Sequence, residues 1–268
     1  MTKGQNHCKI LLISRQESNL YQRFFLCIFL LVVGATWLTG FNPIATLSDQ
    51  AYFWQFLRDD FFPPKVTKVP ELLQAILTTL QIAFGATFVA TIIAAILAPF
   101  GSLATTPLPI LPKLIRGFAS IFRNIPALVW ALLLFMSFGV GTGVGFLAIF
   151  IQTLGFLLRA FIEIIDEVGA AALEATTASG ATFAQKIFQV VLPSCLIGYV
   201  SWFLYSLELN IRSSTIVGMV GGGGVGMVIF AYIKSFKYDV AAGIIIAVAL
   251  LIIGFDGLTQ YLRRKVLM

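Results

Sequence analysis

Long apolar runs separated by short polar segments dominate the pattern of this chain. A helix needs about 20 apolar residues to cross a bilayer. Six runs approach or exceed that length, at residues 24–40, 72–99, 118–138, 143–165, 193–211 and 239–261. The pattern therefore predicts an all-α membrane protein with about six transmembrane helices. The first run follows a basic tail, as a cleaved leader does, but no convincing small-residue cleavage site follows it, so we expect a retained helix.

The composition also indicates that most of this chain lies within the lipid bilayer. Of its 268 residues, 59% are hydrophobic and 11% are charged, and the mean hydropathy is +0.94. These values exclude an ordinary water-soluble domain. Lys and Arg residues set the orientation. With both ends in the cytoplasm, twelve cations lie inside and six outside, the outer six being Arg58, Lys65, Lys68, Arg212, Lys234 and Lys237.

The net charge of +6 does not indicate a nucleic-acid partner. The cations are scattered at the ends of the apolar runs, where they contact anionic lipid headgroups. Cys8, Cys27 and Cys195 lack metal-ligand spacing, and the single histidine, His7, lies in the polar tail. We therefore expect membrane lipid as a partner, and neither a metal site nor nucleic-acid binding.

The apolar runs divide the chain into four parts. We predict a cytoplasmic basic tail at 1–23, a first transmembrane helix with a polar external segment at 24–71, a transmembrane domain at 72–262 and a cytoplasmic basic end at 263–268. Small residues recur every three or four positions in the run at 72–99, so we expect this helix to pack centrally.

A polar insert, about 166–193, separates the fourth and fifth apolar runs. If residues 163–179 form one helix, three of its glutamates lie within about 40° of one another, at positions 163, 167 and 174. Gly180 then interrupts the helix. The insert predicts a compact projection that a partner can grip, with an ordinary hairpin between spans as the alternative.

The second half of the insert has the spacing of an amphipathic helix. Its apolar residues follow the i, i+4, i+7, i+8 pattern of a helix packed against the rest of the protein, at Phe183, Ile187, Val190 and Val191. Leu192 and Pro193 close the insert, and we expect Pro193 to begin the next span.

The spacing of Glu174-Ala175-Thr176, Gly180, Val190 and Leu192-Pro193 resembles the EAA loop of ATP-binding-cassette importer permeases. Thr176 and Val190 depart from the residues usual in that motif. The stretch SLELNIRSSTIVGMVGGGGVG resembles the phosphonate-type permeases in particular.

The resemblance implies a type I importer permease fold in the bacterial cytoplasmic (inner) membrane, with a cytoplasmic coupling helix. It implies that a separate ATPase grips the loop through Glu174, Ala175, Thr176, Gly180, Leu192 and Pro193. Its further implied partners are a second permease copy, forming a homodimer, and a periplasmic or lipid-anchored binding protein for phosphonate, phosphite or phosphate. The chain has no G-x-x-x-x-G-K-[ST] phosphate loop, so we expect no cofactor here, and ATP and Mg²⁺ on the partner.

Polar residues near the end of the fifth run are candidates for a translocation path or gate. Charges at bilayer depth need pairing or a watery cavity, and hydroxyl and guanidinium donors suit a phosphorus oxyanion. The candidates are Glu208, Asn210, Arg212, Ser213 and Ser214. Glu208 and Arg212 are four residues apart and can pair on a helix, so a salt bridge ending the span is the alternative.

The segment GGGGVG at 221–226 satisfies G-x-G-x-x-G but lacks a surrounding βαβ pattern, which argues against a dinucleotide site. We predict a pliable external gate that includes Gly221, Gly223 and Gly224, with a simple turn as the alternative. A membrane-embedded enzyme would need clustered catalytic side chains that this chain lacks. A proton-coupled secondary transporter remains the alternative function, although the spans contain few carboxylates.

Overall fold

The structure is a computed structural model that describes residues 15–42, 48, 50–106, 108–168 and 170–267. Every regular element in these ranges is helical. The chain divides into two compact units, Met1–Asp59 and Asp60–Met268.

The first unit contains α1 (Arg15–Thr39) and α3 (Gln50–Phe56), and the π-helical turn η1 (Leu57–Phe61) follows. The part of α1 from Asn19 to Thr39 is long and apolar enough to cross a membrane, and none of it is buried within the chain. A helix that is apolar on all sides needs lipid or another protein around it. The predicted first span is therefore present as a helix of sufficient length.

In the second unit, α4 (Val69–Gly101) packs along α7 (Thr142–Val168), α10 (Leu192–Val217) and α11 (Gly224–Lys234). Its buried face includes a row of alanines, namely Ala83, Ala86, Ala90, Ala94 and Ala98. Small side chains let neighbouring backbones approach closely, which favours helix packing in lipid. The predicted central position of this helix is confirmed.

The third predicted span, 118–138, is bent. It comprises the end of α5 (Ile110–Asn124) and all of α6 (Ala127–Phe138), which meet at 87°. Ile125 is extended because it precedes Pro126, whose ring disfavours the helical conformation in the preceding residue. Five described helices are long and apolar enough to span a bilayer, or six if this bent pair counts as one.

The segment predicted as one helix over 163–179 is helical on both sides of residue 169, which lies outside the described residues. Helix α7 ends at Val168 and α8 (Ala170–Ala178) begins two residues later. Glu163 and Glu167 therefore share a helix, whereas Glu174 belongs to the next one. Glu163 is paired with Arg159, with 2.5 Å between carboxylate and guanidinium, rather than contributing to a free acidic stripe.

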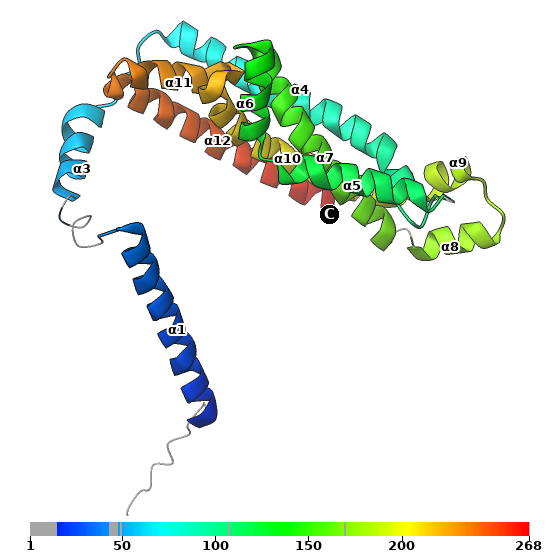
Figure 1. Cartoon of the computed structure of the whole chain (residues 1–268). Coiled ribbons are helices and arrows are strands. Elements are labelled where there is room, and N and C mark those ends of the chain that lie inside the picture. Colours follow the sequence, from blue (N-terminus) through cyan, green and yellow to red (C-terminus); the bar gives the residue numbers. More distant parts are fainter. Residues whose placement is uncertain (1–14, 43–47, 49, 107, 169, 268) are drawn as a thin grey trace, which may run out of the picture. The chain divides into compact units, whose positions relative to one another are not determined.

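The opposite end of the second unit contains a helix that the sequence pattern did not predict. Helix α10 continues to Val217, the π-helical turn η3 (Gly218–Gly222) follows, and α11 then packs against α4 and α12 (Tyr238–Leu267). Figure 1 shows α8 and α9 (Phe183–Lys186) at one end of the helix bundle and α11 at the other. Arg212, expected outside, lies within α10.

Candidate functional site

Two capping motifs, one at the end of α8 and one at the beginning of α9, determine the shape of the loop that contains the EAA-like residues. Helix α8 ends in a Schellman motif, in which the Ala181 amide donates to the Thr176 carbonyl (3.1 Å) and the Gly180 amide to that of Thr177 (3.0 Å). Gly180 has φ +79°, and a Cβ there would meet nothing within 4 Å. Glycine is thus favoured by the backbone conformation rather than by crowding.

The next helix, α9, begins with a capping box. The Thr182 amide donates to Gln185 Oε1 (2.8 Å), and the Gln185 amide donates to Thr182 Oγ1 (3.4 Å). The T-x-x-Q spacing is a sequence signal for this cap that our sequence analysis missed.

The predicted amphipathic face of the insert is confirmed. Val190 and Val191 are buried and Ile187 packs against the same core, while the ring of Phe183 lies 5.3 Å from that of Phe100. Pro193 lies in the first turn of α10, as predicted, although helical structure is continuous from Phe183 through the π-helical turn η2 (Ile187–Val191) into α10. Proline has no backbone N–H to donate to the preceding turn of the helix, and the π-helical turn before Pro193 accommodates this missing hydrogen bond.

The residues of the EAA-like motif lie where another protein can reach them. Glu174 and Ala175 are exposed on α8, and Thr176 is half-buried with its hydroxyl donating to the Ala172 carbonyl (2.9 Å). Leu192 and Pro193 are exposed at the beginning of α10.

An ionic cluster that was not predicted from the sequence holds the end of α7, just before the loop, against the helix bundle. Asp166, near the end of α7, accepts from Ser102 (2.6 Å) and pairs with Arg116 (2.5 Å), which also donates to the Gly101 carbonyl. This cluster joins the end of α7 to the α4–α5 connection. Its members are 50 and 64 residues apart, too far for a local sequence pattern to reveal.

The predicted path residues do not form one group. Arg212 lies 3.5 Å from Asp256 and 3.9 Å from Glu208, and Glu208 lies 3.9 Å from Arg263, so this ionic face is directed at α12. Ser214 is buried and donates to the Thr79 carbonyl (3.3 Å) on α4. Successive helical residues are about 100° apart, so neighbours in sequence point in different directions.

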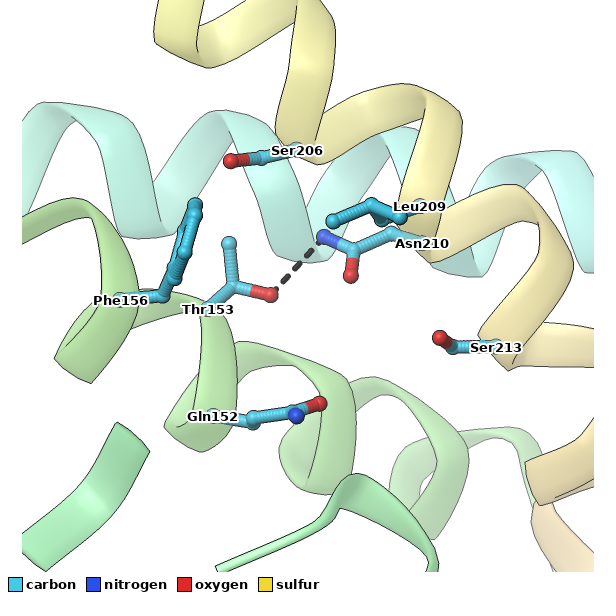
Figure 2. A pocket seen from close by; sticks show the side chains of 7 residues that line it. All are labelled: Gln152, Thr153, Phe156, Ser206, Leu209, Asn210 and Ser213. Carbon is cyan, nitrogen blue, oxygen red and sulfur yellow. Dashed lines mark hydrogen bonds between the residues drawn. The ribbon is translucent and has the colours of Figure 1, made fainter. Parts of the chain in front are cut away.

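Asn210 and Ser213 line a cavity of about 250 Å³ between α7 and α10, called here the polar cavity (Figure 2). The other polar side chains that line it, Gln152, Thr153 and Ser206, were not predicted from the sequence. Phe156 and Leu209 complete the lining, so no charged residue among those described takes part. Asn210 donates to Thr153 on α7 and to Thr87 on α4, each at 2.8 Å.

The glycine segment between α10 and α11 is tightly packed. A Cβ at Gly224 would lie 2.4 Å from the Thr79 hydroxyl, and Gly221, Gly223 and Gly224 all have positive φ. The Gly221 carbonyl accepts from the Gly141 amide at 3.0 Å. Close contact and backbone conformation therefore both favour glycine here; the gate role stays a prediction.

A second cavity, of about 430 Å³, opens beside this segment and is lined by Glu71, Gln74 and Thr78 of α4 together with Gly223 and Gly224. Glu71 pairs with Lys68 at 3.1 Å, and this hydrogen bond raises the pKa of the Lys68 ammonium above its ordinary value of 10.5.

Comparisons with known proteins identify the family. Residues 98–268 match the family described as binding-protein-dependent transport system inner membrane component. The chain belongs to this family. It is therefore the membrane permease of an ATP-driven importer, a multi-pass protein of the inner membrane. It is not an enzyme, and ATP hydrolysis belongs to a separate chain.

Two relatives resemble this permease over most of its length. It is 27% identical over 234 residues to the phosphite transport system permease protein PtxC of Stutzerimonas stutzeri, covering 87% of this chain and 82% of the relative. It is 26% identical over 233 residues to the phosphate-import permease protein PhnE of Mycolicibacterium smegmatis, covering 87% of this chain but only 44% of that protein.

A solved structure agrees with the fold of the permease. The MetNI methionine ABC transporter, in an inward-facing conformation, aligns with a TM-score of 0.62 and 20% sequence identity, covering 75% of this chain and 99% of the matched chain. The predicted type I importer permease fold is confirmed.

Proposed function

We propose that this permease carries a phosphorus oxyanion, namely phosphonate, phosphite or phosphate, across the inner membrane. The names of the two relatives above support this substrate class, since one is a phosphite permease and the other a phosphate-import permease. The uncharged, hydrogen-bonding lining of the polar cavity is compatible with an oxyanion in transit.

The α8–α9 loop couples transport to ATP hydrolysis in this proposal. The observation that carries it is the exposure of Glu174 and Ala175 on a capped, compact projection at one end of the bundle (Figure 1). Phe188, in the same loop, is 70% exposed. An acidic residue, small side chains and an exposed aromatic ring suit the groove of an ATPase subunit.

Two attachments transmit movement of the loop into the helix bundle. Asp166, Ser102 and Arg116 fix the end of α7 to the α4–α5 connection. Val190 and Val191 fix the other end of the loop to the core that contains α7 and α10. Displacement of the loop when two ATPase subunits close therefore shifts α7 and α10, which together line the polar cavity.

The importer contains further partners. The ATPase subunits bind ATP and Mg²⁺, and this chain holds no cofactor. A phosphonate-type solute-binding protein, periplasmic or lipid-anchored, docks at the external end near Gly221, Gly223 and Gly224. A second copy of the permease completes a homodimer, and lipid surrounds α1.

Reconstituted vesicles test the substrate and the energy source. The permease is combined with the ATPase and binding protein encoded beside it, and uptake of labelled phosphite, phosphate and methylphosphonate is measured. We expect uptake that requires ATP and the binding protein. Uptake driven instead by a proton gradient would favour the secondary-transporter alternative. Glycine betaine, which contains no phosphorus, serves as the control substrate.

Two loop variants test the coupling. Glu174→Lys reverses the charge on the exposed face of α8, and Gly180→Asp adds a charge where the space is open. We expect each to lower uptake about tenfold or more by weakening ATPase docking while the protein still inserts. Gly180→Asn is the matched control, because Asn tolerates positive φ without adding charge. Normal coupled transport in both charged variants would reject this role for the loop.

A further inference from the structure

The polar cavity contains a buried hydroxyl without a partner. Ser206 is 2% exposed, and its Oγ has no hydrogen-bond partner in the described part of the chain. A buried polar group in this state is destabilising, and native proteins contain few of them. Ser206 lies on the lining of the cavity (Figure 2), where a ligand can complete its hydrogen bond.

Thr153 adds a second available donor. Its hydroxyl oxygen accepts from the Asn210 amide at 2.8 Å, and within the described residues its hydroxyl hydrogen has no acceptor. Gln152 and Ser213 also line the cavity, and Figure 2 shows their polar ends in the space below the Asn210 side chain. The lining therefore offers hydroxyl and amide donors from two helices.

The hydrogen bonds of Asn210 fix the direction of its amide. Thr87 donates its hydroxyl hydrogen to the Ala83 carbonyl (2.6 Å), so Thr87 must accept from the nitrogen of Asn210. Both amide hydrogens are used, on Thr87 and Thr153. The Asn210 oxygen consequently remains available as an acceptor beside the donors of the cavity.

We propose that the polar cavity is a transient binding site for a singly protonated tetrahedral oxyanion. This inference rests on the proposed function. Ser206 and Ser213 are about 10.5 Å apart along α10, because they are separated by seven residues of helix. The ion therefore contacts them in turn: its P–O oxygens accept from Thr153 and Ser206 in one part of the cavity and from Gln152 and Ser213 in the other (Figure 2), and its P–O–H group donates to the Asn210 oxygen. The uncharged lining suits a path, because a site that conducts must bind strongly enough to admit an ion and weakly enough to release it.

The arrangement of charge on α10 supports an anion held by neutral groups. Arg212 is directed at Asp256 and Glu208, on the face toward α12. A lone arginine in the cavity would hold an oxyanion through charge-assisted bonds that slow its release. The volume of about 250 Å³ is smaller than that of a drug-sized pocket and fits a small ion with water.

Deletion of one hydroxyl is the first test. Ser206→Ala is compared with Thr215→Val, which also removes a buried, unpartnered hydroxyl from α10 but outside the cavity lining. In vesicles with the complete transporter, we expect Ser206→Ala to lower phosphite uptake about tenfold, the effect of one hydrogen bond to a charged ligand. Thr215→Val should transport like the wild type.

A change of charge is the second test. Gln152→Glu keeps the shape of the side chain but directs a carboxylate at the cavity, so we expect uptake of the oxyanion to fall by more than tenfold. Gln152→Leu removes the amide without adding charge and should have a smaller effect. Normal insertion and binding-protein docking are checked for every variant by copurification.

The outcomes separate this inference from the proposed function. If the wild type transports a phosphorus oxyanion but Ser206→Ala and Gln152→Glu transport equally well, the cavity is not on the path and only this inference fails. If Gln152→Leu falls as far as Gln152→Glu, the cavity does not select for charge, and its assignment to an anion is wrong. A wild-type complex that transports none of the three oxyanions overturns the proposed function itself.

Discussion

Helix α10 presents two polar faces that differ in charge. On the face toward α12, Glu208 and Arg212 join Asp256 and Arg263 in a network of ion pairs. On the face toward α7, Ser206 and its neighbours are neutral and incompletely hydrogen-bonded. A charge in an apolar environment must be paired within the fold, whereas a neutral donor can be left for a ligand at a smaller cost.

The largest effect is expected on the ionic face. Glu208→Ala removes the carboxylate that lies near both Arg212 and Arg263. We expect the free energy of unfolding to fall by about 2–3 kcal/mol, because the partly buried guanidinium of Arg263 loses its carboxylate partner. Thermal unfolding of the purified permease in detergent measures this change. A loss no larger than that of Ser206→Ala would remove the distinction between the two faces.

The buried amide should rank second. Asn210→Leu is nearly isosteric but removes both hydrogen bonds that join α10 to α4 and α7. We expect a loss of about 2 kcal/mol, since two hydroxyl oxygens lose their buried donor. Thr153→Val is the companion variant and should cost less, because it leaves only one amide hydrogen without an acceptor.

A paired replacement sharpens the comparison. Arg212→Met with Asp256→Met substitutes apolar residues for one ion pair, and such exchanges are often neutral for stability. We expect the double variant to be more stable than Arg212→Met alone by about 1–2 kcal/mol, which a double-mutant cycle measures. If the double variant is as unstable as the sum of the single changes, the two side chains do not interact.

The smallest effect on stability belongs to the neutral face. Ser206→Ala should change the free energy of unfolding by less than about 0.5 kcal/mol or raise it slightly, because the hydroxyl has no partner to lose. The same thermal unfolding measurement applies. A large destabilisation would mean that the Ser206 hydroxyl contributes to the fold, and its assignment to a ligand would then lose its basis.

Local signals in the sequence determined much of the helical architecture. Runs of apolar residues predicted the long helices, because each must satisfy its backbone hydrogen bonds within lipid. Spacing also predicted the buried face of Val190 and Val191, the interruption at Gly180 and the resemblance to importer permeases. These features depend on residues close together in the chain, where periodicity and backbone conformation act directly.

Only the tertiary structure decided which polar residues share a site. Sequence proximity grouped Arg212, Ser213 and Ser214, but the turn of the helix directs them to three different surroundings. The polar cavity instead joins Gln152 and Thr153 of α7 to residues of α10 more than fifty positions away. Packing of distant helices creates such neighbours, and no local pattern records which faces will meet.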